Sequence, residues 1–137
     1  MFSSMTRAIL LPVALLVVSC ASHRSSAAPD EWQRLEAEGN RQTSKREGKI
    51  WEYRMLPVHN GFWAKVHDTC APKARVAGID SFKAVAIIDR DGVIQQFLTQ
   101  PDAKALDCFS RQIAGNRYPP PPEALFYEVI NVKLGAE

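Results

Sequence analysis

An α+β fold with a small antiparallel three-stranded sheet is predicted by three stretches of the sequence. In the first, 82–99, two apolar runs flank Asp89-Arg90-Asp91-Gly92, a strong β-hairpin signal because glycine adopts a positive φ without a Cβ clash. The second, Pro101–Ala114, starts with a helix-compatible proline and carries a helical apolar stripe. In the third, Ala124–Leu134, apolar and polar residues alternate, as in a half-buried strand. With a helix before the hairpin, the expected order is helix-strand-strand-helix-strand, with the helices packed on one face of the sheet.

Length and composition are those of one globular domain. The chain has 137 residues, of which 46% are hydrophobic and 23% are charged. The formal net charge is +2, with 17 basic residues interspersed among 15 acidic ones. No basic stripe or aromatic platform is visible, so no nucleic-acid partner is expected.

The N-terminus, 1–19, has the pattern of a signal peptide. Arg7 precedes the apolar run Ala8–Val18, which is too short for a membrane-spanning helix. The residues at the end of this run, Val17-Val18-Ser19-Cys20, resemble a bacterial lipobox, and this resemblance implies a mature protein that begins at lipidated Cys20. The alternative is an ordinary secretory signal, cut after Ala21 or within 26–28.

Lipidation of Cys20 would anchor the protein in the bacterial cell envelope through acyl chains such as palmitate. The expected location faces the periplasm, with the outer membrane favoured. Residues 20–43 are expected to form a flexible tether and a polar segment, and 44–137 the folded domain. Asp30–Arg46 can form a short helix, but only Trp32 and Leu35 could make an apolar stripe, so we expect no deep packing there.

Two helices are predicted before the hairpin. The first covers about Ser44–Leu56 and is ended by Pro57, although a strand is the alternative for so short a run. The second covers Gly61–Ala71 after the N-cap residue Asn60 and is ended by Pro72. The aromatic residues of this region are expected in the core rather than in a ligand patch; they are Trp51, Tyr53, Phe62 and Trp63.

Cys70 and Cys108 both lie on or beside apolar helical stripes. After export they would be in a compartment where disulfides persist, so we expect them to be linked. The alternative is two unpaired buried thiols that act as small hydrophobic residues.

Motifs of known catalytic and phosphate-binding sites are absent from the sequence. There is no G-x-S-x-G and no glycine-rich phosphate loop. The segment 89–92 lacks the further acidic ligands of a calcium loop and is interpreted as a turn. Pro119–Pro122 is interpreted as a rigid extended connector, with a groove ligand as the alternative. No cofactor is expected.

The residues from about 62 to 134 resemble the C-terminal domain shared by TonB and TolA proteins. The resemblance depends on the hairpin 84–94, a following helix of matching length, the segment Tyr118–Pro122 and a final amphipathic strand. Small exported proteins of this kind also carry one cysteine at the end of the first helix and one in the second, as Cys70 and Cys108 do. This chain departs from TonB in its lipobox and short tether, since TonB keeps an inner-membrane helix and a long proline-rich spacer.

The resemblance implies a non-catalytic adaptor that binds an unknown envelope protein. Partners of the family add a strand at the edge of the sheet, where main-chain hydrogen bonds supply affinity. Here they would pair with the final strand or enter a helix-sheet groove near Tyr118. The partner-binding residues expected on this basis are Tyr118, Leu125, Tyr127, Val129 and Asn131.

A competing hypothesis is a small metal-binding or thiol-based enzyme. His59, His67, Cys70 and Cys108 supply the nitrogen and sulfur ligands of a four-coordinate metal site, but their spacing matches no familiar zinc motif. A cysteine nucleophile would need an exposed thiolate beside a base.

Overall fold

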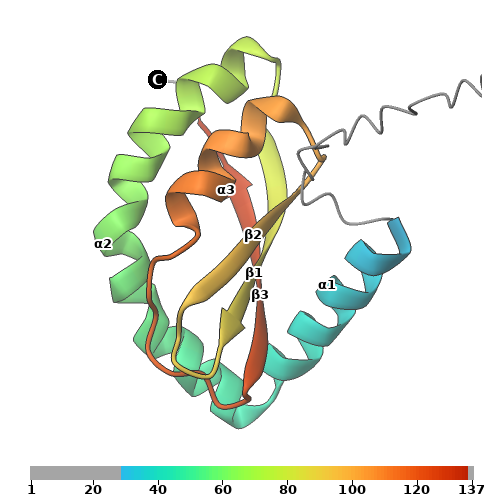
Figure 1. Cartoon of the computed structure of the whole chain (residues 1–137), viewed down its shortest axis with the longest axis vertical. Helices are drawn as coiled ribbons and strands as arrows, with labels where there is room; N and C mark the ends of the chain where they lie inside the picture. Colours follow the sequence, from blue (N-terminus) through green and yellow to red (C-terminus); the bar gives the residue numbers. More distant parts are fainter. Residues whose placement is uncertain (1–28, 136–137) are drawn as a thin grey trace, which may run out of the picture.

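The structure, a computed structural model, describes residues 29–135 and confirms the α+β class. Cys20, the predicted signal peptide and the first part of the predicted tether lie outside the described residues. The elements are α1 (Pro29–Ser44), α2 (Arg46–Val76), β1 (Ser81–Asp89), β2 (Ile94–Gln100), a 3-10 turn (Lys104–Leu106), α3 (Asp107–Ile113) and β3 (Leu125–Lys133). Figure 1 shows α2 and α3 on one side of the sheet and α1 on the other.

The predicted hairpin is confirmed as β1 and β2. The Asp89 carboxylate accepts hydrogen bonds from the backbone N–H groups of Asp91 and Val93, each at 2.9 Å, so it shapes the turn. Gly92 has φ +83°, and a Cβ there would collide with the carbonyl of Tyr118. The strand order is β2-β1-β3, antiparallel throughout, which makes β1 the central strand.

The main core lies between the sheet and the helices α2 and α3. Along β1, alternate side chains face this core, and the same alternation continues on β3. The buried residues contributed by β1 are Phe82, Ala84, Ala86 and Ile88. Val132 and Leu134 are buried as the alternation of the final strand predicts, and Ile130 packs against the same core.

Helix α1 corrects the expectation of a polar segment without deep packing, and with it the expectation of helices on one face only. Trp32 and Leu35 are 6% and 4% exposed and form a second core with Val85 and Leu98 on the opposite face of the sheet. Two apolar residues three positions apart lie on one face of a helix, and this narrow stripe is enough. Both faces of the sheet are therefore covered.

Helix α2 replaces the two helices predicted before the hairpin, and the prediction of stops at Pro57 and Pro72 was wrong. A single helix of 31 residues contains both prolines. Each proline removes one backbone hydrogen bond, but both are exposed, so water can satisfy the freed carbonyls. The buried face that holds the helix together includes Trp51, Met55, Val66, Cys70 and Ala74.

The helix predicted over Pro101–Ala114 is shorter in the structure. It begins with the 3-10 turn and becomes α-helical only over α3. None of the helices within 29–135 combines the length and apolar character needed to cross a membrane.

The disulfide between Cys70 and Cys108 is confirmed. It joins α2 to α3, with the two Cα atoms 5.5 Å apart and a sequence separation of 38. Cys70 is fully buried, so the link is part of the main core.

Replacing both Cys70 and Cys108 with serine should lower the free energy of unfolding by about 3 to 4 kcal/mol, because an open chain gains more entropy on unfolding. Denaturant titration of the oxidised protein and of the double variant measures this difference. A reducing agent should destabilise the wild type and leave the double variant unchanged. Peptides mapped without reduction should show the two cysteines linked, and two freely alkylated thiols would contradict the assignment.

Candidate functional site

The outer edge of β3 is the region that the sequence singled out for partner binding. In the sheet, β3 pairs with β1 on one side only, so its other side is a free strand edge. The backbone groups of Leu125 and Tyr127 point outward, since both bond to a side chain of α1. Val129 and Asn131, at the following alternate positions, point the same way.

The side chain of Gln42, at the end of α1, closes the first half of this edge. Its Nε2 donates to the carbonyl of Leu125 at 2.8 Å, and its Oε1 accepts from the backbone N–H of Tyr127 at 2.9 Å. A neighbouring strand would offer the same donor and acceptor, so the amide takes the place of a strand. Nε2 also lies 3.2 Å from the carboxylate of Glu123, and Gln42 is only 2% exposed.

Gly39 allows α1 to approach the strand so closely. A Cβ at this position would lie 2.6 Å from the Tyr127 carbonyl oxygen and 2.7 Å from Cγ2 of Val129. The side chains of Tyr127 and Val129 pack against the second core, whereas Asn131 is exposed.

The second half of the edge, from Val129 onward, is open. Within 29–135, no hydrogen bond joins the outward backbone groups of Val129 or Asn131 to a group outside the sheet. A groove of about 500 Å³ lies beside Tyr127, and its other walls come from α1. These α1 residues are Arg34, Leu35, Ala37, Glu38 and Arg41.

Tyr118 does not belong to this edge, although the sequence grouped it there. It is 2% exposed and lies beneath α2, stacked on Phe62 at 5.8 Å between ring centroids. Its hydroxyl lies 2.7 Å from Nδ1 of His59. The predicted groove at Tyr118 is filled by this packing, so Tyr118 is a core residue.

Three ionisable side chains near the main core were not predicted as a group: Tyr118 and Glu128 are buried, and His59 is half-buried. Glu128 is 5% exposed, on the same face of β3 as the core residues, and its Oε2 has no hydrogen-bond partner among the described residues. Burial, reinforced by the charge of Glu52, raises the pKa of Glu128 to about 8. Burial also lowers the pKa of His59 and, together with Glu128, raises the pKa of Tyr118, so the neutral forms of all three groups are favoured.

A sequence signal for Glu128 did exist. It occupies an even position of β3, where its neighbours Phe126 and Ile130 face the core. Gln42 and Gly39 gave no such signal, because only the tertiary structure brings them to the strand edge.

Of the aromatic residues of α2 predicted in the core, Trp51 is buried, and Phe62 and Trp63 are half-buried against the main core. Trp51 donates its indole N–H to the carbonyl of Pro119 at 2.8 Å, which ties the proline segment to α2. Trp63 stacks on His59 at 5.2 Å and on Phe109 at 5.9 Å. Tyr53, by contrast, is 83% exposed.

The four residues of the metal or thiol hypothesis are not assembled as a site. The disulfide occupies both cysteine sulfurs, while His59 contacts Tyr118 and His67 lies near the carbonyl of Leu134. Across 29–135, no three histidine, cysteine, aspartate or glutamate side chains are grouped so as to hold a metal ion.

Replacing Gln42 with alanine should open the first half of the β3 edge. The Leu125 carbonyl and the Tyr127 amide lose their partners, which should lower the free energy of unfolding by about 1 to 3 kcal/mol. Hydrogen exchange at the Tyr127 amide should accelerate more than at the amides that bond to β1. Gln33→Ala, on an exposed position of the same helix, is the matched control, and equal exchange in both variants would contradict the role of Gln42.

Replacing Glu128 with glutamine should flatten the dependence of stability on pH. Between the ordinary pKa of 4.5 and the raised value of about 8, the folded wild type keeps a proton that the unfolded chain loses. Its free energy of unfolding should therefore fall by a few kcal/mol across this range, since one pKa unit corresponds to about 1.4 kcal/mol.

Comparing the two proteins by denaturant titration at pH 5 and pH 8.5 isolates this effect. The burial of neutral His59 lowers stability as pH falls below its ordinary pKa, but it does so in both proteins. Glu52→Gln should move the decline of stability to lower pH without abolishing it, because the charge of Glu52 contributes to the raised pKa. Parallel pH profiles for wild type and Glu128→Gln would exclude an elevated pKa at Glu128.

Comparisons of this chain with protein-family models, curated proteins and solved structures find no match.

Proposed function

We propose that this protein is a non-catalytic adaptor of the bacterial cell envelope, anchored through a lipid at Cys20, that binds a partner protein by strand addition at β3. The observation that carries the proposal is the open second half of the β3 edge. There the outward backbone groups of Val129 and Asn131 have no partner within the described part of the chain. An added strand would satisfy them with main-chain hydrogen bonds.

The first half of this edge, which Gln42 covers, already forms hydrogen bonds of the kind that an added strand would make. Gln42 already makes a donor-acceptor pair with Leu125 and Tyr127, at distances typical of hydrogen bonds between strands. A partner strand that starts at Val129 would continue this pattern toward Lys133. Its side chains would alternate between the α1 side of the sheet and the α2 side.

The lipobox resemblance and the disulfide support an envelope location. A disulfide in a core helix pair fits a protein that folds in an oxidising compartment. The TonB/TolA-like succession of motifs supports strand addition as the mode of binding. The filled space around Tyr118 and the open edge at Val129 favour the strand edge over the helix-sheet groove that the sequence left as the alternative.

Val129→Pro tests the proposal, because proline removes an outward N–H that the sheet itself does not use. Full-length protein used as bait in bacterial envelope extracts should lose its partner when it carries this change. Val129→Ala is the matched control, since it shortens the side chain but keeps the N–H, and it should retain capture.

Two measurements protect this test from a folding artefact. Both variants should keep the Cys70–Cys108 link and melt within a few degrees of wild type. In the captured complex, the amides of Val129 and Asn131 should exchange more slowly than in the free protein. Undiminished capture by Val129→Pro would refute binding at this edge.

A further inference from the structure

The other edge of the sheet, along β2, is also only partly closed. At its start, Ile94 pairs outward, with its N–H donating to the Asn116 carbonyl at 2.9 Å and its carbonyl accepting from Gly115 at 2.8 Å. After the irregularity between Ile87 and Ile88 on β1, the pairing register runs from Gln96 to Gln100.

Within this register, Phe97 and Thr99 present their backbone groups outward. The N–H of Asp89 donates to the carbonyl of Val93, just before β2, so the odd-numbered residues of β1 point their backbone groups toward β2. Their partners there are Gln96, Leu98 and Gln100. The residues between these partners, Phe97 and Thr99, therefore point their backbone N–H and C=O groups away from β1. In the part of the chain that the structure describes, no hydrogen bond joins the backbone of Phe97 or Thr99 to a group outside the sheet.

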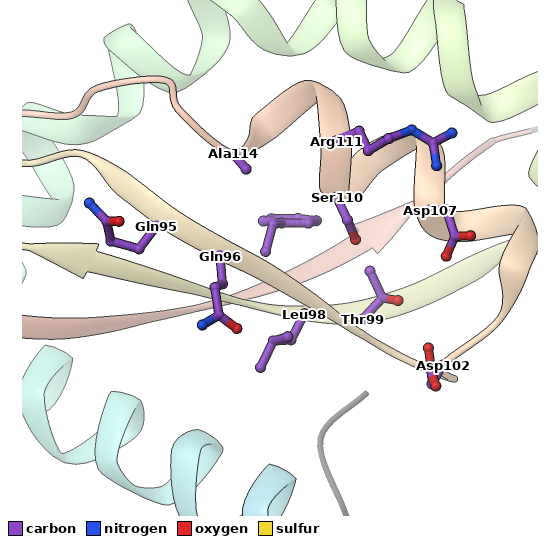
Figure 2. Close-up of a pocket in the computed structure, with 10 residues that line it drawn as sticks. Gln95, Gln96, Leu98, Thr99, Asp102, Asp107, Ser110, Arg111 and Ala114 are labelled. Carbon is purple, nitrogen blue, oxygen red and sulfur yellow. The ribbon is translucent and has the colours of Figure 1, made fainter. Parts of the chain in front are cut away.

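A groove of about 360 Å³ lies along this open stretch, between β2 and α3. It exists because α3 runs back beside the strand that precedes it (Figure 1). Figure 2 shows Ser110 above the strand, Asp107 and Arg111 close to each other on the α3 side, and Asp102 apart from them, where β2 leaves the sheet. Gln95 and Ala114 lie at the opposite end of the groove.

The charged side chains that line the groove are Asp102, Asp107 and Arg111, so the groove carries a net negative charge that favours a basic ligand group. Neither Asp102 nor Asp107 forms an ion pair within the described residues, and neither does Arg111, the groove's basic side chain. Asp102 is exposed and Asp107 is half-buried, so a bound basic group would meet two unpaired carboxylates.

The spacing of the backbone groups indicates what kind of ligand fits. Outward groups on alternate residues repeat about every 7 Å along a strand, which matches the repeat of another extended peptide. The groove volume lies at the low end of the range for ligand pockets, which suits a few residues of a peptide.

We propose that the β2–α3 groove is a second peptide-binding site. It takes an extended protein segment that adds to β2 as a strand and places a lysine or arginine beside Asp102 and Asp107. This site does not depend on strand addition at β3, because the two edges lie on opposite sides of β1. Occupation of both edges would let one small sheet bridge two protein chains.

The probes for the test are eight-residue peptides of alternating serine and valine, labelled with a fluorophore and carrying lysine, glutamate or serine at one end or the other. Fluorescence polarisation with the full-length protein should show that one lysine peptide binds about three- to tenfold more tightly than its glutamate counterpart. The preference should shrink in 0.5 M salt.

Two kinds of variant locate the binding. Thr99→Pro removes an outward N–H and should weaken the lysine peptide about tenfold or more, whereas Thr99→Ser keeps the N–H and should bind as wild type does. Asp102→Asn with Asp107→Asn changes two side chains that form no described ion pair; it should abolish the preference for lysine and leave the melting temperature close to that of wild type.

The outcomes separate this site from the one at β3. Loss of peptide binding in Val129→Pro but not in Thr99→Pro would overturn the β2 groove and leave the proposed function standing. Equal affinity for lysine and glutamate peptides, or no binding of any peptide, would also overturn the groove. Failure of the proposed function would appear instead as unchanged envelope capture by Val129→Pro, whatever the peptides do.

Discussion

Burial of β1 on both of its faces is the constraint on which this fold depends. The strand is central in the sheet, and Val85 is as completely buried on one face as Ala84 and Ala86 are on the other. A sheet with one solvent-exposed face would need helices on its other face only. Here a second helical layer is required, and α1 provides it with few apolar residues. This second layer brings α1 very close to β3. Gly39 permits the approach because it has no Cβ, and Gln42 uses it to form hydrogen bonds with the backbone of Leu125 and Tyr127.

Local chemistry explains what the sequence could predict. The hairpin depends on Asp89 and Gly92, whose partners lie within a few residues, and the alternation of β3 follows directly from its neighbours. The disulfide could be expected because the signal-peptide pattern predicts export to a compartment where disulfides persist. The prediction that residues of α1 do not pack deeply was wrong because their partners lie far away in sequence. Trp32 and Leu35 look too sparse to bury a helix until the outer face of β1 is known to be apolar and uncovered.

At the candidate sites, too, local features could be predicted from the sequence and contacts between distant residues could not. The sequence could identify β3 as a strand that might accept a partner, but not that Gln42, more than 80 positions away, covers its first half. It grouped Tyr118 with that edge because the two are adjacent in sequence, whereas the proline segment carries Tyr118 beneath α2. Nor could it show that α3 lies along β2 and forms a groove. Glu128 places an ionisable side chain in an otherwise apolar core, and such conflicts tend to mark strained or functional positions.

The link between Cys70 and Cys108 has a consequence for when the protein can act. It fixes α3 to α2, and α3 is one wall of the groove beside β2. In a newly made chain whose cysteines are still reduced, that wall would be held only by packing. The shape of the groove would thus be coupled to the oxidation state of Cys70 and Cys108, and it would be fully fixed only once their disulfide has formed.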